Sequence, residues 1–266
     1  MKYSEAVEAL KNAGISNPRH EARLIFEDVC GVERNALFTS DPESADADAA
    51  VARRVLREPL QYIIGKTAFF KEEYFVSPDC LIPRADTEIL VEVAIKNLKA
   101  GDRFIDLCTG SGCVAVSTLR NTENTRALAL DISEVALKMA ERNACHNGVI
   151  DRVDFILSDA LTYEPNEKFD ALLSNPPYIE KTVYEGLLAE IFHEPKIALV
   201  ADDGGLLFYK TFIPKYKSKI NPGGFMAFEI GYDQGDALLE IARENGLCAE
   251  IIKDYGGNDR VAFIRV

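Results

Sequence analysis

The short segment "SNPPY", residues 174–178, places an amide, two prolines and an aromatic ring directly after the apolar run "FDALL". Proline lacks a backbone N–H and restricts the residue before it, so the segment cannot continue a strand or a helix. The amide oxygen of Asn175 and the carbonyl oxygen of Pro176 can both accept hydrogen bonds from one –NH2 group, and Pro177 helps to fix their directions. The ring of Tyr178 offers a flat surface for a planar amide or base. The segment predicts a site for a planar, conjugated –NH2 group; a rigid turn without a ligand is the alternative.

A glycine-rich segment, "DLCTGSGCVA" at residues 106–115, lies between a predicted strand and a predicted helix. Gly110 and Gly112 let the backbone approach a ligand closely and allow a tight turn from strand to helix. Asp131 ends the next predicted strand, where a carboxylate can accept hydrogen bonds from both hydroxyls of a ribose. These features alone would also fit a nicotinamide-dependent dehydrogenase.

Asp106 argues against a dinucleotide, because it ends the first of these strands just before the glycine-rich turn. A carboxylate there would repel a pyrophosphate, and a low dielectric strengthens that repulsion. It suits a ligand with ammonium and sulfonium groups, and S-adenosylmethionine carries both together with a ribose for Asp131. We therefore expect S-adenosylmethionine as the cofactor. The alternatives are that Asp106 braces the loop and that Asp131 caps the next helix, although Ser133 is the more natural cap.

Two further segments end predicted strands and point to the same place. Asp159, in "LSDA", could accept a hydrogen bond from the amino group of adenine, and a surface turn residue is the alternative. Asn175 follows the fourth strand of the series. Because ligands bind at the carboxyl ends of the strands in an open α/β sheet, we expect Asn175, Gly110 and Asp131 to face one crevice.

Helical segments come first in the chain. Residues 4–14, 17–31 and 41–59 have the start signals, stop signals and apolar spacing of helices, and together they would form a small bundle that is marginal alone. Residues 60–83 are rich in β-branched and aromatic side chains around Gly65. This composition predicts a hairpin that links two domains.

From residue 86 onward, helical and strand patterns alternate, which predicts an α/β fold with a mostly parallel seven-stranded sheet and helices on both faces. The last two strands, within 248–252 and 260–266, are joined by a short turn, so they should form an antiparallel hairpin at the edge of the sheet. We expect a helical domain at 1–60, a hairpin linker at 61–85 and an α/β domain at 86–266.

Composition limits the possible partners. Among 266 residues, 43 acidic side chains exceed 30 basic ones and give a net charge of −13, so we expect no general binding to nucleic acid. The sequence shows no signal-peptide pattern and no long apolar run, so we expect a cytoplasmic protein without membrane contact. Six scattered cysteines without a Cys-x-x-Cys pair, and three distant histidines, predict neither a metal site nor disulfides.

With these motifs in place, the chain resembles the amino-group methyltransferases, whose hallmark is Asn/Asp-Pro-Pro followed by an aromatic residue. It is similar in particular to the peptide chain release factor glutamine N5-methyltransferases. The resemblance covers almost the whole length and rests on "REPLQYIIGKTAFF", "FVSPDCLIPRADTEILVE", "DLCTGSGCVAVS", "DISEVALKMAERNA", "LLSNPPYI", "EPKIALVADDGGLLFY" and "DYGGNDR".

The resemblance implies a Rossmann-like S-adenosylmethionine-dependent methyltransferase domain and an N-terminal helical domain that engages the release factor. The substrate would be the glutamine of a Gly-Gly-Gln loop. Carried over to this sequence, the implied cofactor contacts are Thr109, Gly110, Ser111, Gly112, Asp131 and Asn175. The implied glutamine site is Asn175, Pro176, Pro177 and Tyr178. Arg84 and Glu88, in "IPRADTE", are candidate wall residues of that site, and an interdomain ion pair is the alternative.

Two positions depart from the family pattern, and two other functions stay open. Ala85 stands where a second proline is common, which predicts a slightly looser loop, and Ala160 stands where members often place a large side chain near adenine. The closest rival function is an adenine N6-methyltransferase on DNA or RNA, which uses the same tetrapeptide for a flipped base. The other rival is a non-catalytic, cofactor-binding scaffold protein.

Overall fold

The computed structural model describes residues 1–266, and the chain divides into two compact units. The first unit comprises Met1–Lys66, Val76–Pro78 and Leu188–Glu194. The second unit comprises Thr67–Phe75, Asp79–Leu187 and Pro195–Val266. All of the predicted cofactor and substrate residues belong to the second unit.

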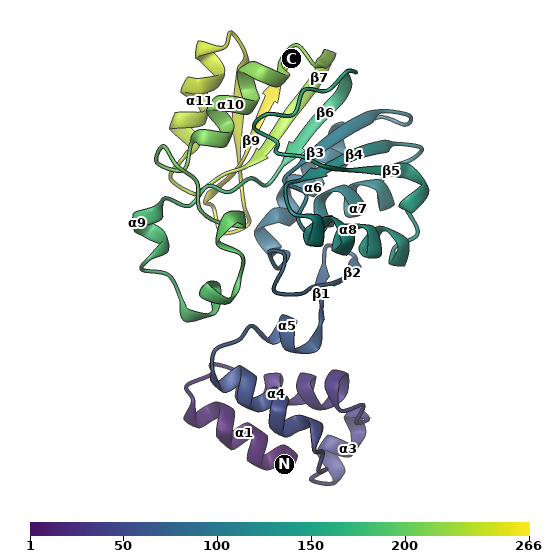
Figure 1. The fold of residues 1–266 in the computed structure, drawn as a ribbon, viewed down its shortest axis with the longest axis vertical. Coiled ribbons are helices and arrows are strands. Elements are labelled where there is room, and N and C mark those ends of the chain that lie inside the picture. The colour runs from purple at the N-terminus through teal and green to yellow at the C-terminus, as the bar shows by residue number, and fades with distance from the viewer. The chain divides into compact units, whose positions relative to one another are not determined.

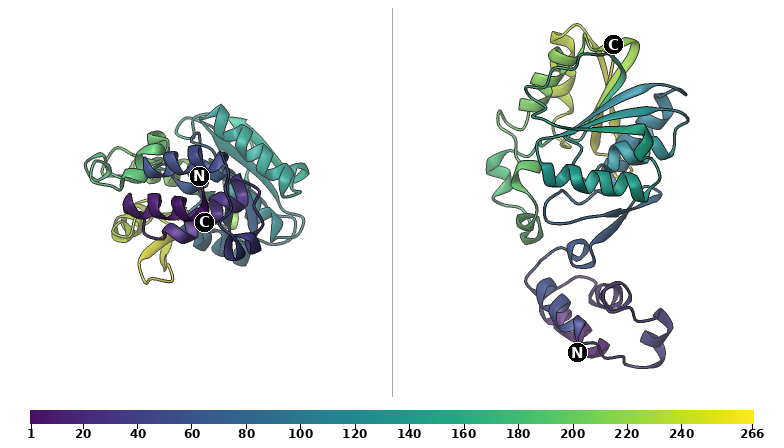
Figure 2. Two further views of the ribbon diagram at one scale, coloured as in Figure 1. Left: turned by 90° about the horizontal axis from the view of Figure 1, so that it is seen from below. Right: turned by 45° about the vertical axis from the view of Figure 1, so that its right-hand side comes forward.

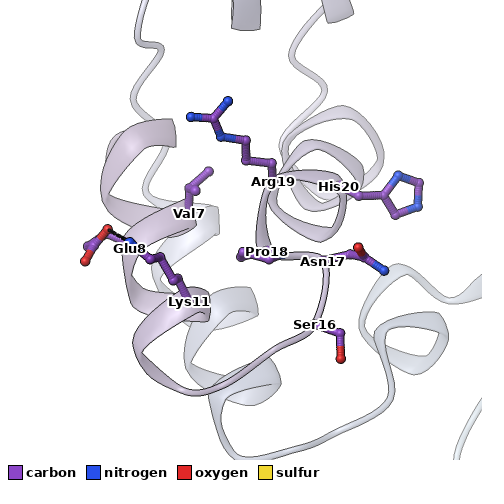
Figure 3. Close-up of a pocket in the computed structure, with 8 residues that line it drawn as sticks. All are labelled: Val7, Glu8, Lys11, Ser16, Asn17, Pro18, Arg19 and His20. Carbon is purple, nitrogen blue, oxygen red and sulfur yellow. Dashed lines mark ion pairs between the residues drawn. The ribbon is translucent and has the colours of Figure 1, made fainter.

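The first unit is helical, and its helices and turns are α1 (Tyr3–Asn12), α2 (Pro18–Leu24), the π-helical turn η1 (Ile25–Val29), α3 (Arg34–Thr39), α4 (Asp46–Val55), α5 (Leu60–Ile64) and the 3-10 turn η4 (Ala189–His193). Leu10, Phe26 and Val51 are buried together in its core. A surface hollow of about 490 Å3 lies where α1 ends and α2 begins, and Figure 3 shows Glu8 and Lys11 on one wall. None of the predicted cofactor or substrate residues lines this hollow.

The second unit is built on a seven-stranded sheet, shown in Figure 1, whose strands are β3 (Arg103–Leu107), β4 (Arg126–Asp131), β5 (Val153–Leu157), β6 (Phe169–Ser174), β7 (Ile220–Glu229), β8 (Cys248–Lys253) and β9 (Asp259–Arg265). Their order is β5-β4-β3-β6-β7-β9-β8. The first five strands pair in parallel, while β9 pairs antiparallel with both β7 and β8. The predicted fold class, with its antiparallel edge hairpin, is confirmed.

Helices cover both faces of this sheet, as Figures 1 and 2 show. Alternate strand residues face opposite sides: Phe104 packs with α6 (Glu88–Asn97), α7 (Cys113–Arg120) and α8 (Glu134–His146), whereas Ile105 packs with α10 (Leu207–Tyr216) and α11 (Gly235–Glu244). This is the period of two expected of a strand that is buried on both faces. The remaining short turns of this unit are η2 (Ala85–Thr87), η3 (Ile150–Arg152), α9 (Lys181–Tyr184) and η5 (Lys196–Ala198).

Within the segment predicted as a hairpin, the structure has a hairpin of β1 (Lys66–Phe69) and β2 (Glu72–Phe75), while Leu60–Ile64 form the helix α5 instead. Asn143 of α8 fastens it, because its amide pairs with the backbone N–H of Phe75 at 2.8 Å and the carbonyl of Phe75 at 3.0 Å. The same amide donates to the carbonyl of Ser111 at 2.9 Å. One buried side chain therefore links the hairpin to the glycine-rich loop.

No helix of the chain combines the length and the apolar character that crossing a bilayer requires.

Candidate active site at the carboxyl edge of the sheet

Three neighbouring strands of the sheet, β4, β3 and β6, end side by side. Leu107 of β3 is paired with Leu130 of β4 and with Ser174 of β6. Since these strands are parallel, the glycine-rich loop, Asp131 and Asn175 all leave the sheet at one edge. The structure thus brings together the segments that the sequence analysis placed in one crevice.

The glycine-rich loop is held open toward that edge. Gly110 and Gly112 have φ angles of +55° and +80°, which L side chains rarely adopt. A Cβ on Gly112 would lie 2.9 Å from the Cβ of Ala140, so this glycine lets the loop pack tightly against α8. A Cβ on Gly110 would meet no atom within 4 Å. The backbone at Gly110 is therefore open to the approach of a ligand.

Asp131 holds this loop with both of its carboxylate oxygens. Oδ2 accepts the backbone N–H of Gly110 at 2.8 Å, and Oδ1 accepts that of Ser133 at 2.9 Å. Burial raises the pKa of Asp131, while its backbone hydrogen bonds oppose the rise. The backbone N–H of Ile132 also bonds to this carboxylate, so at least one of its roughly four acceptor positions remains for a hydroxyl group. The side chain that caps α8 is Ser133, which accepts from the backbone of Ala136 at 3.3 Å.

Asp106 lies beneath the loop, with only 1% of its surface exposed. The hydroxyl of Thr109 donates to its Oδ2 at 2.6 Å, and the backbone of Ala115 also bonds to it. Burial raises the pKa of Asp106 to about 7, against the lowering effect of these hydrogen bonds. This geometry is that of a brace between β3 and α7; a contact with a cofactor ammonium stays a prediction.

The predicted adenine side of the crevice contains apolar groups that the motif search missed. Oδ1 of Asp159 accepts the backbone N–H of Leu161 at 2.9 Å and so stabilises a turn. Ala160 is buried. By contrast, Ile132 and Leu157 are 52% and 55% exposed at the ends of β4 and β5. An apolar residue directly after Asp131 is a signal that the sequence offered and that a search for polar groups overlooked.

Residues from two distant segments hold the Asn175–Tyr178 motif. Asn175 Nδ2 donates to Oγ1 of Thr87 at 3.1 Å, and the Tyr178 hydroxyl donates to Oε1 of Glu229 at 3.1 Å. The carbonyl of Tyr178 accepts from Nε2 of Gln234 at 3.1 Å. Pro176 and Pro177 of the motif are both buried. The sequence analysis named none of these three supporting residues.

Thr87, which lies between the candidate wall residues Arg84 and Glu88, connects their segment to the site by its hydrogen bond with Asn175. Glu88 Oε1 accepts the backbone N–H of Phe70 at 2.8 Å, so this carboxylate is bonded to the hairpin. Arg84 is half-buried just before η2. Thr87, between them, is 1% exposed and bonds to Asn175. No group of three or more His, Cys, Asp or Glu side chains is arranged to hold a metal ion.

Comparison with known proteins extends over both units. Residues 85–222 match the Methyltransferase small domain, and residues 3–65 match the PrmC N-terminal domain. The release factor glutamine methyltransferase of Fusobacterium nucleatum is 36% identical over 99% of this chain and 77% of its own. That of Moorella thermoacetica is 37% identical over 96% of this chain and 94% of its own.

A solved methyltransferase from Pyrococcus furiosus shares the fold. Its TM-score is 0.54 at 18% identity, and the match covers 72% of this chain and 86% of that one.

Proposed function

The chain belongs to the release factor glutamine methyltransferases, which are S-adenosylmethionine-dependent transferases, and we propose that it methylates N5 of the glutamine in the Gly-Gly-Gln motif of bacterial class-one release factors. The observation that carries this proposal is the orientation of Asn175. Its Nδ2 is engaged by Thr87, so its Oδ1 remains as an acceptor for an incoming –NH2 group. The acceptor for the substrate amide, Asn175 Oδ1, and the ring on which that amide can stack, Tyr178, belong to one rigid segment.

The residues at the sheet edge fit S-adenosylmethionine as cofactor. The open backbone at Gly110 allows close approach, and Asp131 keeps an acceptor position for the ribose. The exposed side chains of Ile132 and Leu157 would pack against the faces of the adenine ring. They would take the place of the large side chain that the chain lacks at Ala160. We assign Asp159 to the adenine amino group, and Ser111 and Thr109 to the loop that surrounds the methionine part.

The protein's task in the reaction is orientation. When bound, the cofactor supplies an electrophilic sulfonium methyl group. A glutamine amide nitrogen is a weak nucleophile because its lone pair is delocalised, so an in-line approach matters more than a base. Asn175 Oδ1 and the carbonyl oxygen of Pro176 accept hydrogen bonds from the two N–H groups of the glutamine amide. These bonds turn its nitrogen toward the methyl group. These bonds strengthen as positive charge develops on the nitrogen, which stabilises the transition state; the proton then leaves to water.

Mass spectrometry of a release factor incubated with this protein and isotope-labelled cofactor tests the proposal. One labelled methyl group on the glutamine of the Gly-Gly-Gln motif is expected. Asn175→Ala is the matched control, because it removes one of the two acceptors for the substrate amide. Label on adenine of added DNA or RNA instead would favour the rival N6-methyltransferase, and no label on either substrate would favour a scaffold protein. A net charge of −13 argues against the nucleic-acid substrate.

We assign recognition of the release factor, as a folded protein, to the helical unit. Its match to the PrmC N-terminal domain supports this role, as does the fact that none of the predicted cofactor or substrate residues belongs to it. Hydrogen exchange of the full-length protein should show slower exchange in residues 3–64 when a release factor is added. If protection were confined to the second unit, the docking role would be wrong.

A further inference from the structure

A chain of buried polar groups lies directly behind the Asn175–Tyr178 motif. Asn175 donates to Thr87 Oγ1, and the Tyr178 hydroxyl donates to Oε1 of Glu229, both at 3.1 Å. The Thr87 hydroxyl also faces the Glu229 carboxyl and lowers its pKa. Thr87 and Glu229 are each 1% exposed, so water does not compete for these bonds.

The direction of each bond in this chain is fixed by chemistry. A hydroxyl carries one hydrogen, and Thr87 already accepts from Asn175, so its own hydrogen is free to go to Glu229. An ionised carboxylate accepts and cannot donate. With a carboxylate at one end, the Asn175 amide has its –NH2 side toward Thr87 and its oxygen toward the opposite side. The charge of Glu229 thereby selects one of the two orientations of the Asn175 amide.

We propose that Glu229 and Thr87 are positioning residues, which together hold the Asn175 oxygen toward the substrate amide and anchor the ring of Tyr178. The inference rests on the proposed function, since it assigns to Asn175 the acceptor role derived above. Neither residue needs to touch the substrate. The effect of Thr87 reaches the reacting nitrogen through two hydrogen bonds, and that of Glu229 passes through Thr87.

Packing alone does not explain a glutamate at this position. Its second carboxylate oxygen, Oε2, is buried and has no hydrogen-bond partner. An incompletely bonded carboxylate in a protein interior lowers stability. Replacing the charge with a neutral group of the same shape should therefore leave the protein as stable as before or more so, while a positioning role requires that activity falls.

The electrostatic surroundings predict a titration of this group. Burial raises the pKa of Glu229, and the hydrogen bonds of Thr87 and Tyr178 together with the charge of Arg260 lower it, while Asp86 raises it. Two other ionisable side chains, Cys113 and Tyr209, also face Glu229. The charge of Glu229 contributes to the raised pKa of each. Protonation of Glu229 turns it into a possible donor, so the methyl-transfer rate should fall at acid pH.

The experiment compares single-turnover methylation of a release factor at saturating cofactor and saturating factor. Glu229→Gln can donate to Thr87 Oγ1 and compete with Asn175, so the rate should fall about tenfold to a hundredfold, as for groups that orient a functional ligand. The rate of Thr87→Val should fall by a similar factor, whereas Thr87→Ser, which keeps the hydroxyl, should retain most of the wild-type rate. The acid limb of the rate profile that belongs to Glu229 should be missing in Glu229→Gln.

Tyr209→Phe is the matched control for disturbance near Glu229. The Tyr209 hydroxyl donates to the backbone carbonyl of Glu229 at 2.8 Å and makes no bond to its carboxylate. This variant should melt at a lower temperature and retain the single-turnover rate, whereas Glu229→Gln should keep its melting temperature and lose rate. A melting temperature that falls in step with the rate in Glu229→Gln would mark a merely structural residue and overturn the inference.

Two failures can be told apart. If the wild-type protein transfers no methyl group to a release factor, the proposed function fails. If the wild type is active and both Glu229→Gln and Thr87→Val keep its rate, the function stands and the positioning role of these residues is refuted.

Discussion

Gly205→Ala should impair methylation strongly through a clash with the end of the motif. Gly205 has a φ of +82°, and a Cβ built on it would lie 2.2 Å from the carbonyl oxygen of Tyr178 and 2.7 Å from Nε2 of Gln234. The Gln234 amide bonds to the same carbonyl at 3.1 Å. The added methyl group therefore strikes both members of the contact that holds Tyr178.

The size of the effect follows from how far the motif must move. Contacts of a Cβ shorter than 3.0 Å are essentially never seen, so the carbonyl of Tyr178 and residue 205 must separate further than the 2.2 Å of the clash. A displacement approaching about 1 Å of the segment that orients the substrate amide typically lowers the rate about a hundredfold. The left-handed backbone adds a strain of about 1–2 kcal/mol to the free energy of folding.

Gly204→Ala separates these two effects. Gly204 also has a positive φ, +63°, but a Cβ there would meet no atom within 4 Å. Both variants should lose stability in urea denaturation from the left-handed strain, Gly205→Ala more so because of its clash, and only Gly205→Ala should lose the single-turnover rate. If the two variants had equal rates, the contact between Gly205 and Tyr178 would not govern the position of the motif, and the reasoning would be refuted.

Three further predictions concern the cofactor and the substrate amide. Asp131→Asn should weaken cofactor binding by about 1.5–3 kcal/mol, as for hydrogen bonds to a charged group; an unchanged dissociation constant in calorimetry would remove Asp131 from the site. Because burial raises the pKa of Asp106 to about 7, a cationic cofactor should expel its proton, so affinity should rise with pH up to about 7 and level off, and a wild-type slope that persists in Asp106→Asn would contradict this. Asn175→Ala should lower the single-turnover rate about a hundredfold to a thousandfold, while Asn175→Asp, which keeps an acceptor, should retain clearly more activity; equal activity of the two variants would make the amide donor the essential half of Asn175.

The architecture of the second unit was predictable because local pattern and tertiary environment agree there. Apolar runs such as "RFIDL" and "DALLS" are long enough for a strand buried on both faces, and each is followed by residues that end a strand. The helices α10 and α11 were not predicted, although they complete the second layer. Pro214 lies inside α10, and an internal proline normally argues against a helix.

Asp106 shows how a residue can be placed correctly in sequence while its environment is still missed. It follows Ile105, which packs with α10 and α11, so the period of two turns Asp106 to the face of Phe104, toward α7. A carboxylate there meets the backbone N–H groups that begin a helix, and the structure shows such a bond from Ala115. This part of the geometry was available from the strand pattern, and it favours the loop-bracing interpretation.

The support of the motif was not available in the same way. Asn175 and Thr87 are 88 positions apart, and Tyr178 and Glu229 are 51 apart. A glutamate in the run "FMAFEIG" breaks the apolar pattern of a central strand, and a buried carboxylate is costly unless it is bonded. That cost is the physical signal: an acidic residue at the carboxyl end of a buried strand must find donors at the sheet edge, where the motif lies. The strand pattern thus predicts that Glu229 is engaged at the site. Only the structure shows that Tyr178 donates to it and that Thr87, which accepts from Asn175, faces it.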